Sequence, residues 1–435
     1  MLATAPELLA QLRVAIARGD DATAASLAEA VLAGEPGHEA TLVWLSARAR
    51  QQGAFADART WAHRGLAIHP DSAALRFQLG AAQAAAGELD AAQTSLQAVP
   101  AGAATHVFAQ LWLGEVQARR GARAASLRTC ARALAMAEQQ GLMAKRAQLP
   151  GDVRIRLDAA MAMLAQARGD AIAQALDGTR LAPDERERVL ASFATQLDRQ
   201  APTPAHPLQQ PAFLFIPGLD DRPWWPREAF ACLAGIEART DDIRAELLAV
   251  LAGDAGFAPY VDMPDDAPAA PMWGALNRSP SWTGFHFFRH GARIDANCER
   301  CPQTAAALEA LPLLRIPGHA PEALFSVLRP HTHIPPHTGV INGRLTVHLP
   351  LLVPADCGAL AVAGEARTWH EGQCLVFDDS FVHEAINRSG QTRVVLIFDL
   401  WHPGLPEPTR AALAAAIAAL GAFNRTLGLG DPMQE

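Results

Sequence analysis

The sequence lacks the features that would place the protein in a membrane, outside the cell or on nucleic acid. It has no run of about 18 apolar residues without charges, so we expect no membrane span. The start, MLATAPELLAQLRVAIARGDD, has no basic leader followed by an apolar core, which argues against a signal peptide. A formal net charge of −8 gives no basic field that would attract nucleic acid. We therefore expect a cytoplasmic protein whose 435 residues form two or three domains.

Cysteine is also scarce, and several common catalytic motifs are missing. Six cysteines are scattered without the spacing of a disulfide framework, which suits a reducing compartment. Cys298 and Cys301 form a lone CxxC pair, and no second pair follows at the spacing of a zinc site. The second half of the chain contains no GxGxxG, no GxxxxGK followed by Ser or Thr, and no GxSxG. These absences argue against nucleotide-binding and hydrolase functions.

The first part of the chain is rich in alanine and repeats with a period of 34 residues. The repeat is marked by four glycines, each between two helical stretches: Gly19, Gly53, Gly87 and Gly121. This pattern resembles tetratricopeptide repeats, in which glycine ends the first helix and alanines let neighbouring helices pack closely. The alternative is a nonrepeating, alanine-rich helical bundle. We predict an all-α repeat domain at residues 1–198, followed by a proline-rich linker, RQAPTPAHPLQQP, at 199–211.

Residues 212–435 have a different pattern, with short β-rich runs between Pro/Gly turns. The runs include ALFSVLRP, GRLTVHLPLLVP, GQCLVFDD, FVHEAIN and TRVVLIFDLW. Such spacing predicts a sandwich or barrel rather than βαβ units. Two helical stretches, PREAFACLAGIEARTDDIRAELLAVLAG and CPQTAAALEAL, precede these runs, and we expect them to buttress one sheet.

Three histidines lie in one short stretch, RPHTHIPPHTG, at residues 329–339. The last of them, His337, precedes a predicted strand, and His383 begins another strand 46 residues later. A transition metal needs neutral imidazoles presented rigidly, with coordination positions left open for reactants. Only a closed, multi-stranded fold could bring these two side chains together. His331 and His333 are expected to lie in the loop or to support the site without binding the metal.

Arg393 follows His383 across the turn NRSG. If the flanking strands pair, Arg393 or a close neighbour lies across from His383 on the same face. An inward guanidinium beside a metal ligand is costly unless an anion meets it. A cosubstrate with two carboxylates, one on the metal and one on the guanidinium, would supply that anion.

Residues 212–403 resemble the aspartyl/asparaginyl β-hydroxylase family of iron(II)- and 2-oxoglutarate-dependent oxygenases. The resemblance runs from FIPGLDDRPWW through HTGVINGRLTVHLPLLVP to FDDSFVHEAINRSGQTRVVLIFDLWHP. It implies a double-stranded β-helix, or jelly roll, that uses iron(II), 2-oxoglutarate and O2. His337 and His383 match the iron ligands, and Arg393 matches the arginine that pairs with the distal carboxylate of 2-oxoglutarate. The resemblance assigns further contacts with the cosubstrate to Ser326, His348, Arg344 and Phe288.

Two positions depart from related patterns. Many non-haem iron oxygenases carry His-x-Asp, but Gly339 stands two residues after His337, an absence that the resembled family shares. Two histidines alone would then hold the iron. Thr346 stands where animal members of the family carry an arginine, which puts recognition of an acidic substrate residue in doubt.

The leading hypothesis is a dioxygenase that hydroxylates an unactivated C–H, with the β-carbon of an Asp or Asn residue as the expected target. The repeats favour a peptide or protein partner, because such arrays commonly hold extended segments. One alternative is the acyl chain of a lipid, which related bacterial hydroxylases attack. Another is a repeat scaffold whose jelly roll is inactive or only binds metal.

Overall fold

The computed structural model describes residues 4–253, 256–265 and 270–430. The chain divides into two compact units, one formed mainly by residues up to Ala167 and one by Arg168–Asn424. Among the described residues, no helix is long and apolar enough to cross a membrane. All six cysteines are free thiols.

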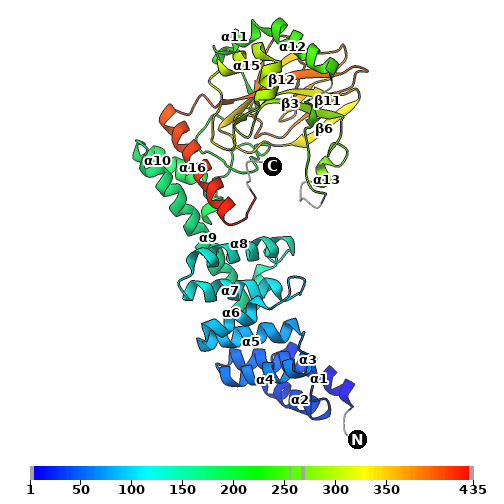
Figure 1. The fold of residues 1–435 in the computed structure, drawn as a ribbon, viewed down its shortest axis with the longest axis vertical. Helices are drawn as coiled ribbons and strands as arrows, with labels where there is room; N and C mark the ends of the chain where they lie inside the picture. Colours follow the sequence, from blue (N-terminus) through cyan, green and yellow to red (C-terminus); the bar gives the residue numbers. More distant parts are fainter. Residues whose placement is uncertain (1–3, 254–255, 266–269, 431–435) are drawn as a thin grey trace. The chain divides into compact units, whose positions relative to one another are not determined.

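The first unit contains four successive helix pairs (Figure 1). The pairs are α1 (Ala5–Arg18) with α2 (Asp21–Gly34), α3 (Glu39–Gln51) with α4 (Phe55–Ile68), α5 (Ala73–Ala86) with α6 (Leu89–Gln97), and α7 (His106–Arg119) with α8 (Arg123–Gln139). Each of the four periodic glycines follows the first helix of its pair with a positive φ, between 69° and 85°. Because L side chains rarely adopt this conformation, glycine ends each of these helices. The predicted helical repeats are confirmed.

Helix α9 (Gly151–Asp177), which follows the short η1 (Arg146–Gln148), covers one face of this array. Arg50 near the end of α3 pairs with Asp152 at 2.8 Å, and the guanidinium of Arg156 lies 3.9 Å from the centre of the Trp112 ring on α7. Val153 joins a buried cluster with α5 and α7. Helices α3 and α7 of the array thus contact the chain's own helix α9.

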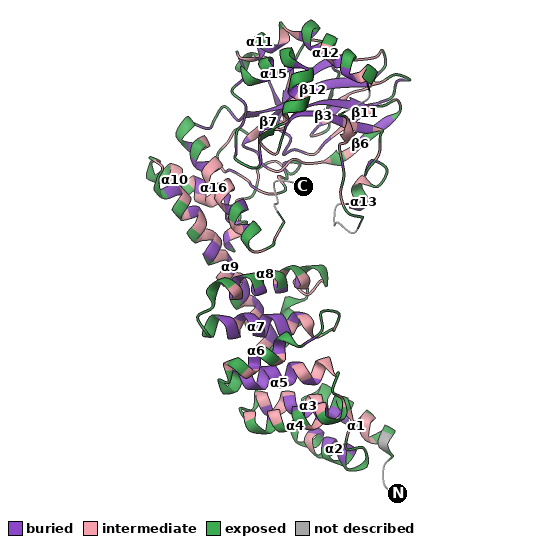
Figure 2. Cartoon of the chain, viewed as in Figure 1, coloured by how far each residue is buried: buried purple, intermediate pink, exposed green. Residues whose placement is uncertain are grey.

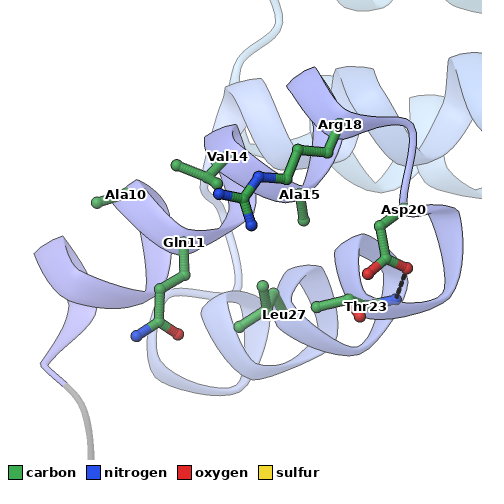
Figure 3. A pocket seen from close by; sticks show the side chains of 8 residues that line it. All are labelled: Ala10, Gln11, Val14, Ala15, Arg18, Asp20, Thr23 and Leu27. Atoms are coloured by element: carbon green, nitrogen blue, oxygen red, sulfur yellow. Dashed lines mark hydrogen bonds between the residues drawn. The ribbon is translucent and has the colours of Figure 1, made fainter.

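An open pocket lies between α1 and α2 (Figure 3). Its lining combines apolar side chains such as Val14 and Leu27 with Gln11 and Arg18. Its carboxylate, Asp20, caps α2 by accepting a hydrogen bond from the backbone of Thr23. The residues that line the pocket include no group of metal-ligating or nucleophilic side chains.

The second unit contains two antiparallel sheets (Figure 1). The larger sheet has the strand order β1-β10-β7-β12-β5-β3-β2, with β4 on β3, and the smaller has the order β6-β11-β8-β9. The strands are β1 (Trp224–Trp225), β2 (Ala258–Pro259), β3 (Trp282–Arg289), β4 (Ala292–Arg293), β5 (Ala323–Leu328), β6 (Thr332–His337), β7 (Arg344–Leu352), β8 (Leu360–Val362), β9 (Glu365–Arg367), β10 (Leu375–Phe377), β11 (His383–Asn387) and β12 (Arg393–Trp401). This is the predicted jelly-roll-like arrangement.

Helices cover the outer face of the larger sheet, as expected (Figures 1 and 2). They are α11 (Leu233–Glu237), α12 (Thr240–Gly253), α14 (Asp295–Arg300) and α15 (Pro302–Glu309), and η3 (Arg227–Ala229) precedes them in the chain. Helix α13 (Ala270–Trp273) instead packs through Trp273 on the cluster between the sheets. Successive strand residues point to opposite faces. On β12, Val394, Leu396 and Phe398 therefore pack against these helices, while Val395 packs between the two sheets. Arg393 and Asp399 lie on the same face of β12 as Val395.

The second unit starts before the predicted linker. The last turns of α9, with α10 (Pro183–Ser192) and η2 (Thr195–Leu197), form a buried cluster with α16 (Glu407–Thr426). The predicted linker at 199–211 is not wholly outside the fold either, because the buried amide of Gln209 donates hydrogen bonds to Asp378 and Ser380. Our boundaries at 198 and 212 followed composition, whereas the compact unit is set by this packing.

Candidate functional site

His337 and His383 meet on the smaller sheet. His337 ends β6, His383 begins β11, and the two residues are directly paired in the antiparallel register. Their ring centroids lie 4.1 Å apart. The fold therefore brings together the two histidines that the sequence singled out, although 46 residues separate them.

Both imidazoles are held in the same tautomer. Nδ1 of His337 donates to the backbone oxygen of Pro335 at 2.8 Å, and Nδ1 of His383 donates to that of Phe381 at 2.9 Å. Nε2 of each ring therefore carries the free lone pair. Burial, aided by the neighbouring His383, lowers the pKa of His337 to about 3, and burial lowers that of His383 to about 4. Neutral rings with a free nitrogen are what metal ligation requires.

Gly339, two residues after His337, has no side chain that could serve as a third metal ligand. A Cβ at Gly339 would overlap the carboxyl group of Asp379, so this carboxylate takes the space of the missing side chain. Asp379 forms an ion pair with Arg344. Across the described ranges, no three or more His, Cys, Asp or Glu side chains are grouped so that they could hold a metal ion.

Arg393 is a buried cation, with 1% of its surface exposed. None of the ion pairs found among the described residues includes it, its Nε has no hydrogen-bond partner there, and its Nη1 makes only a long 3.5 Å contact with the backbone oxygen of Ser326. The indole ring of Trp369 lies 4.7 Å from its guanidinium carbon. Burial lowers the pKa of Arg393 to about 10. A guanidinium kept dry without an acidic partner is costly, which indicates a binding site for an anion.

Ser326 and His348 lie on strands next to Arg393. Ser326 on β5 pairs with Val395, and its hydroxyl accepts a hydrogen bond from the indole of Trp282 at 3.0 Å. His348 on β7 pairs with Ile397. Its Nδ1 accepts a hydrogen bond from the indole of Trp369 at 3.3 Å, so Nε2 carries the proton. Burial and the charge of Arg393 hold its pKa well below the usual range.

The predicted pairing of the strands that carry His383 and Arg393 was wrong. His383 and Arg393 do not lie on paired strands, because β11 belongs to the smaller sheet and β12 to the larger. The turn between them crosses from one sheet to the other, and it is held by Asn387, whose amide donates to the backbone oxygens of Leu328, Arg329 and Gln391.

Phe288 was expected to contact the cosubstrate, but it does not face the space between the sheets. Phe288 packs in the cluster under the outer helices, whereas Trp282 on the same strand packs between the sheets next to Ser326. A bulge at His286 to Phe288 shifts the alternation of β3, which sequence periodicity could not reveal. The positions of Trp369 beside Arg393 and of Asp379 beside Gly339 also depend on tertiary packing. His333 is a surface residue that pairs with Glu384 at 2.6 Å.

Comparison with known proteins agrees with the resemblance. Residues 237–403 match the sequence profile of a family described as aspartyl/asparaginyl beta-hydroxylase. The human aspartyl/asparaginyl beta-hydroxylase is 33% identical over 204 residues, which are 46% of this chain and 25% of that protein. The ornithine lipid ester-linked acyl 2-hydroxylase of Rhizobium tropici is 34% identical over 194 residues, 44% of this chain and 64% of that protein.

The chain thus spans between a quarter and just under two thirds of the length of these two relatives. A solved thermophilic TPR protein of Thermus thermophilus aligns with a TM-score of 0.31 and 21% identity, covering 45% of this chain and 99% of that one. Residues 237–403 of the chain are thus similar to the aspartyl/asparaginyl β-hydroxylase family.

Proposed function

We propose that the protein is an iron(II)- and 2-oxoglutarate-dependent hydroxylase of an unactivated C–H. The observation that carries this proposal is that a histidine pair and a buried arginine lie on the two facing sheets. Two neutral histidines present free Nε2 atoms, and a buried arginine without an acidic partner among the described residues lies on the facing sheet. A metal and a dicarboxylate are the two groups that these features would accept.

The residues fit iron(II) held by His337 and His383. Both rings are neutral, and backbone carbonyls fix their orientation, as hydrogen-bond partners of metal-bound histidine commonly do. Only two protein ligands leave most coordination positions to the cosubstrate, O2 and water. When bound, iron supplies the oxidising power that couples decarboxylation of 2-oxoglutarate to succinate with oxygen insertion into the C–H.

The chain's own residues bind and orient. Arg393 would hold the distal carboxylate through two parallel hydrogen bonds. Ser326, whose backbone oxygen lies 3.5 Å from Nη1 of Arg393, would assist through its hydroxyl. His348 would donate a hydrogen bond from Nε2. The apolar side chains between the sheets, including Leu328, Phe377 and Val395, exclude water from this interior.

For the substrate, we propose the β-carbon of an Asp or Asn residue in a peptide or protein, in line with the name of the human relative. The Rhizobium relative is named for a lipid acyl chain, which makes an acyl chain the second candidate. A scaffold without activity would have no use for a buried arginine that lacks an acidic partner, and such an arginine lowers stability.

Succinate formation tests the proposal. The purified chain should convert 2-oxoglutarate to succinate when iron(II) and O2 are both present, slowly even without a substrate, and omission of either should stop it. Succinate formation that is independent of iron would contradict the proposal.

A further inference from the structure

A chain of charged side chains continues along the inner face of the larger sheet. Arg344 forms an ion pair with Asp379, and its second terminal nitrogen lies 3.9 Å from Asp399. The carboxylate of Asp399 accepts a hydrogen bond at 3.3 Å from the backbone of Glu322. The four side chains are between 3% and 23% exposed.

This charged chain lies at the opposite end of the face from Arg393. The register of β7 and β12 pairs Ile397 with His348 and Asp399 with Thr346, so the distance from Arg393 grows along both strands. If Arg393 binds the distal carboxylate of the cosubstrate, as proposed above, the C–H to be oxidised must approach from the end that carries Arg344 and Asp379.

The charges at that end do not balance. Two acidic side chains, Asp379 and Asp399, contact the single guanidinium of Arg344, and burial raises the pKa of Asp399 to about 7, so that its carboxyl carries part of a negative charge near neutral pH. The groups facing Glu322 from β3 and the turn after it are His286 and His290, at 3.6 and 3.3 Å. A carboxylate that entered here would find an arginine that is already engaged and an excess of negative charge.

Two unsatisfied atoms define what this end would accept. Nε of Arg344, a donor, and Oδ1 of Asp379, an acceptor, are both buried without a hydrogen-bond partner among the described residues. The two atoms belong to the two partners of one ion pair, Arg344 and Asp379. A primary carboxamide satisfies both, because its oxygen accepts from Arg344 and its NH2 group donates to Asp379. A carboxylate has no hydrogen to offer Asp379.

We infer that the site selects an uncharged carboxamide, the side chain of asparagine, over the carboxylate of aspartate at the position that is oxidised. This inference rests on the proposed function. The hydrogen-bond pattern and the charge at this end of the site both favour asparagine.

Two degenerate peptide pools test the inference, each with random flanks and a fixed central Asn or Asp. The full-length protein is supplied with iron(II), 2-oxoglutarate and O2, and mass spectrometry measures oxygen gained at the central residue. We expect the Asn pool to be oxidised faster by about tenfold or more, since sites built to satisfy a hydrogen bond discriminate strongly against analogues that lack it. Equal or faster oxidation of the Asp pool would overturn the inference.

Variants sharpen the test. Asp379→Asn removes the negative charge that pairs with Arg344 and replaces one carboxylate oxygen with an NH2 donor, so the preference should move toward Asp. Thr346→Arg adds a cation on the same face and should do the same. Asp241→Asn, an exposed position on α12, is the matched control and should leave the ratio unchanged. A ratio that neither Asp379→Asn nor Thr346→Arg alters would count against the inference.

The same reactions separate the two proposals. Iron-dependent succinate formation with neither peptide pool oxidised would overturn the asparagine assignment and leave the proposed function standing. Absence of succinate under every condition would overturn both.

Discussion

Replacing Arg393 by methionine should make the ligand-free protein slightly more stable while it destroys cosubstrate binding. A structural arginine would behave in the opposite way, because its removal leaves broken ion pairs. Arg393 has no acidic partner among the described ion pairs, and its burial lowers its pKa from 12.5 to about 10. That shift corresponds to a cost of about 3 kcal/mol for keeping the charge. The cation–π contact with Trp369 returns about 2 kcal/mol.

The difference predicts that Arg393→Met stabilises the ligand-free protein by about 1 kcal/mol. For a domain of this size the melting temperature should rise by roughly 2–4 °C. The cosubstrate loses two charge-assisted hydrogen bonds, each worth about 1.5–3 kcal/mol, so its affinity should fall by about a hundredfold or more. Arg393→Lys keeps the charge but not the geometry for two parallel hydrogen bonds, so its affinity for 2-oxoglutarate should lie between those of wild type and Arg393→Met.

Calorimetric titration of 2-oxoglutarate into zinc-loaded protein measures the affinity, and thermal unfolding of the ligand-free protein measures stability. Arg388→Met, an exposed arginine in the same turn, is the control and should change neither. Unchanged cosubstrate affinity in Arg393→Met, or marked destabilisation with affinity retained, would refute the assignment of this residue.

The other predictions concern a hydrogen bond, a buried carboxylate and a domain boundary. Trp369→Phe keeps a ring over Arg393 but removes the hydrogen bond to His348, so the KM for 2-oxoglutarate should rise by about two- to tenfold in succinate assays, with iron affinity unchanged. Burial would raise the pKa of Glu322, but the neighbouring His286 and His290, together with a hydrogen bond from the backbone N–H of His290, lower it to about 2. Its stabilisation of about 3 kcal/mol should therefore be present above pH 4.5 and disappear as the pH falls to about 2, so urea unfolding of wild type and Glu322→Gln should converge at low pH. A chain that begins at Ala205 should be less stable to urea than one that begins at Arg168, because it loses part of a buried cluster that packs on α16, namely Ile172, Leu176, Val189, Phe193 and Leu197. Equal stability would show that these contacts are dispensable.

Local signals in the sequence predicted much of the helical unit. A left-handed glycine is needed wherever the first helix of a pair ends, so Gly53 and its equivalents marked the repeats directly. The place of α9 was not predictable in this way, because it depends on contacts such as Arg50 with Asp152, which are 102 residues apart. Packing of that kind leaves no periodic trace in the sequence.

The candidate site was predictable where chemistry dictates residue type. His337 and Arg393 stood out because a histidine cluster and an inward arginine each need a partner. The path between the sheets, the bulge that turns Phe288 outward and the carboxylate of Asp379 beside the missing ligand position all arise from tertiary packing. A single sequence carries no direct signal for any of them.

The most direct test of the central claim is an anaerobic titration of iron(II) into wild type, His337→Ala and His383→Ala, with and without 2-oxoglutarate. With only two protein ligands, loss of either should nearly abolish binding. We predict one iron per wild-type chain, tighter binding when 2-oxoglutarate is present, and no comparable binding in either variant. Wild-type affinity in either variant would contradict the account, since iron would then lie elsewhere than between these two histidines.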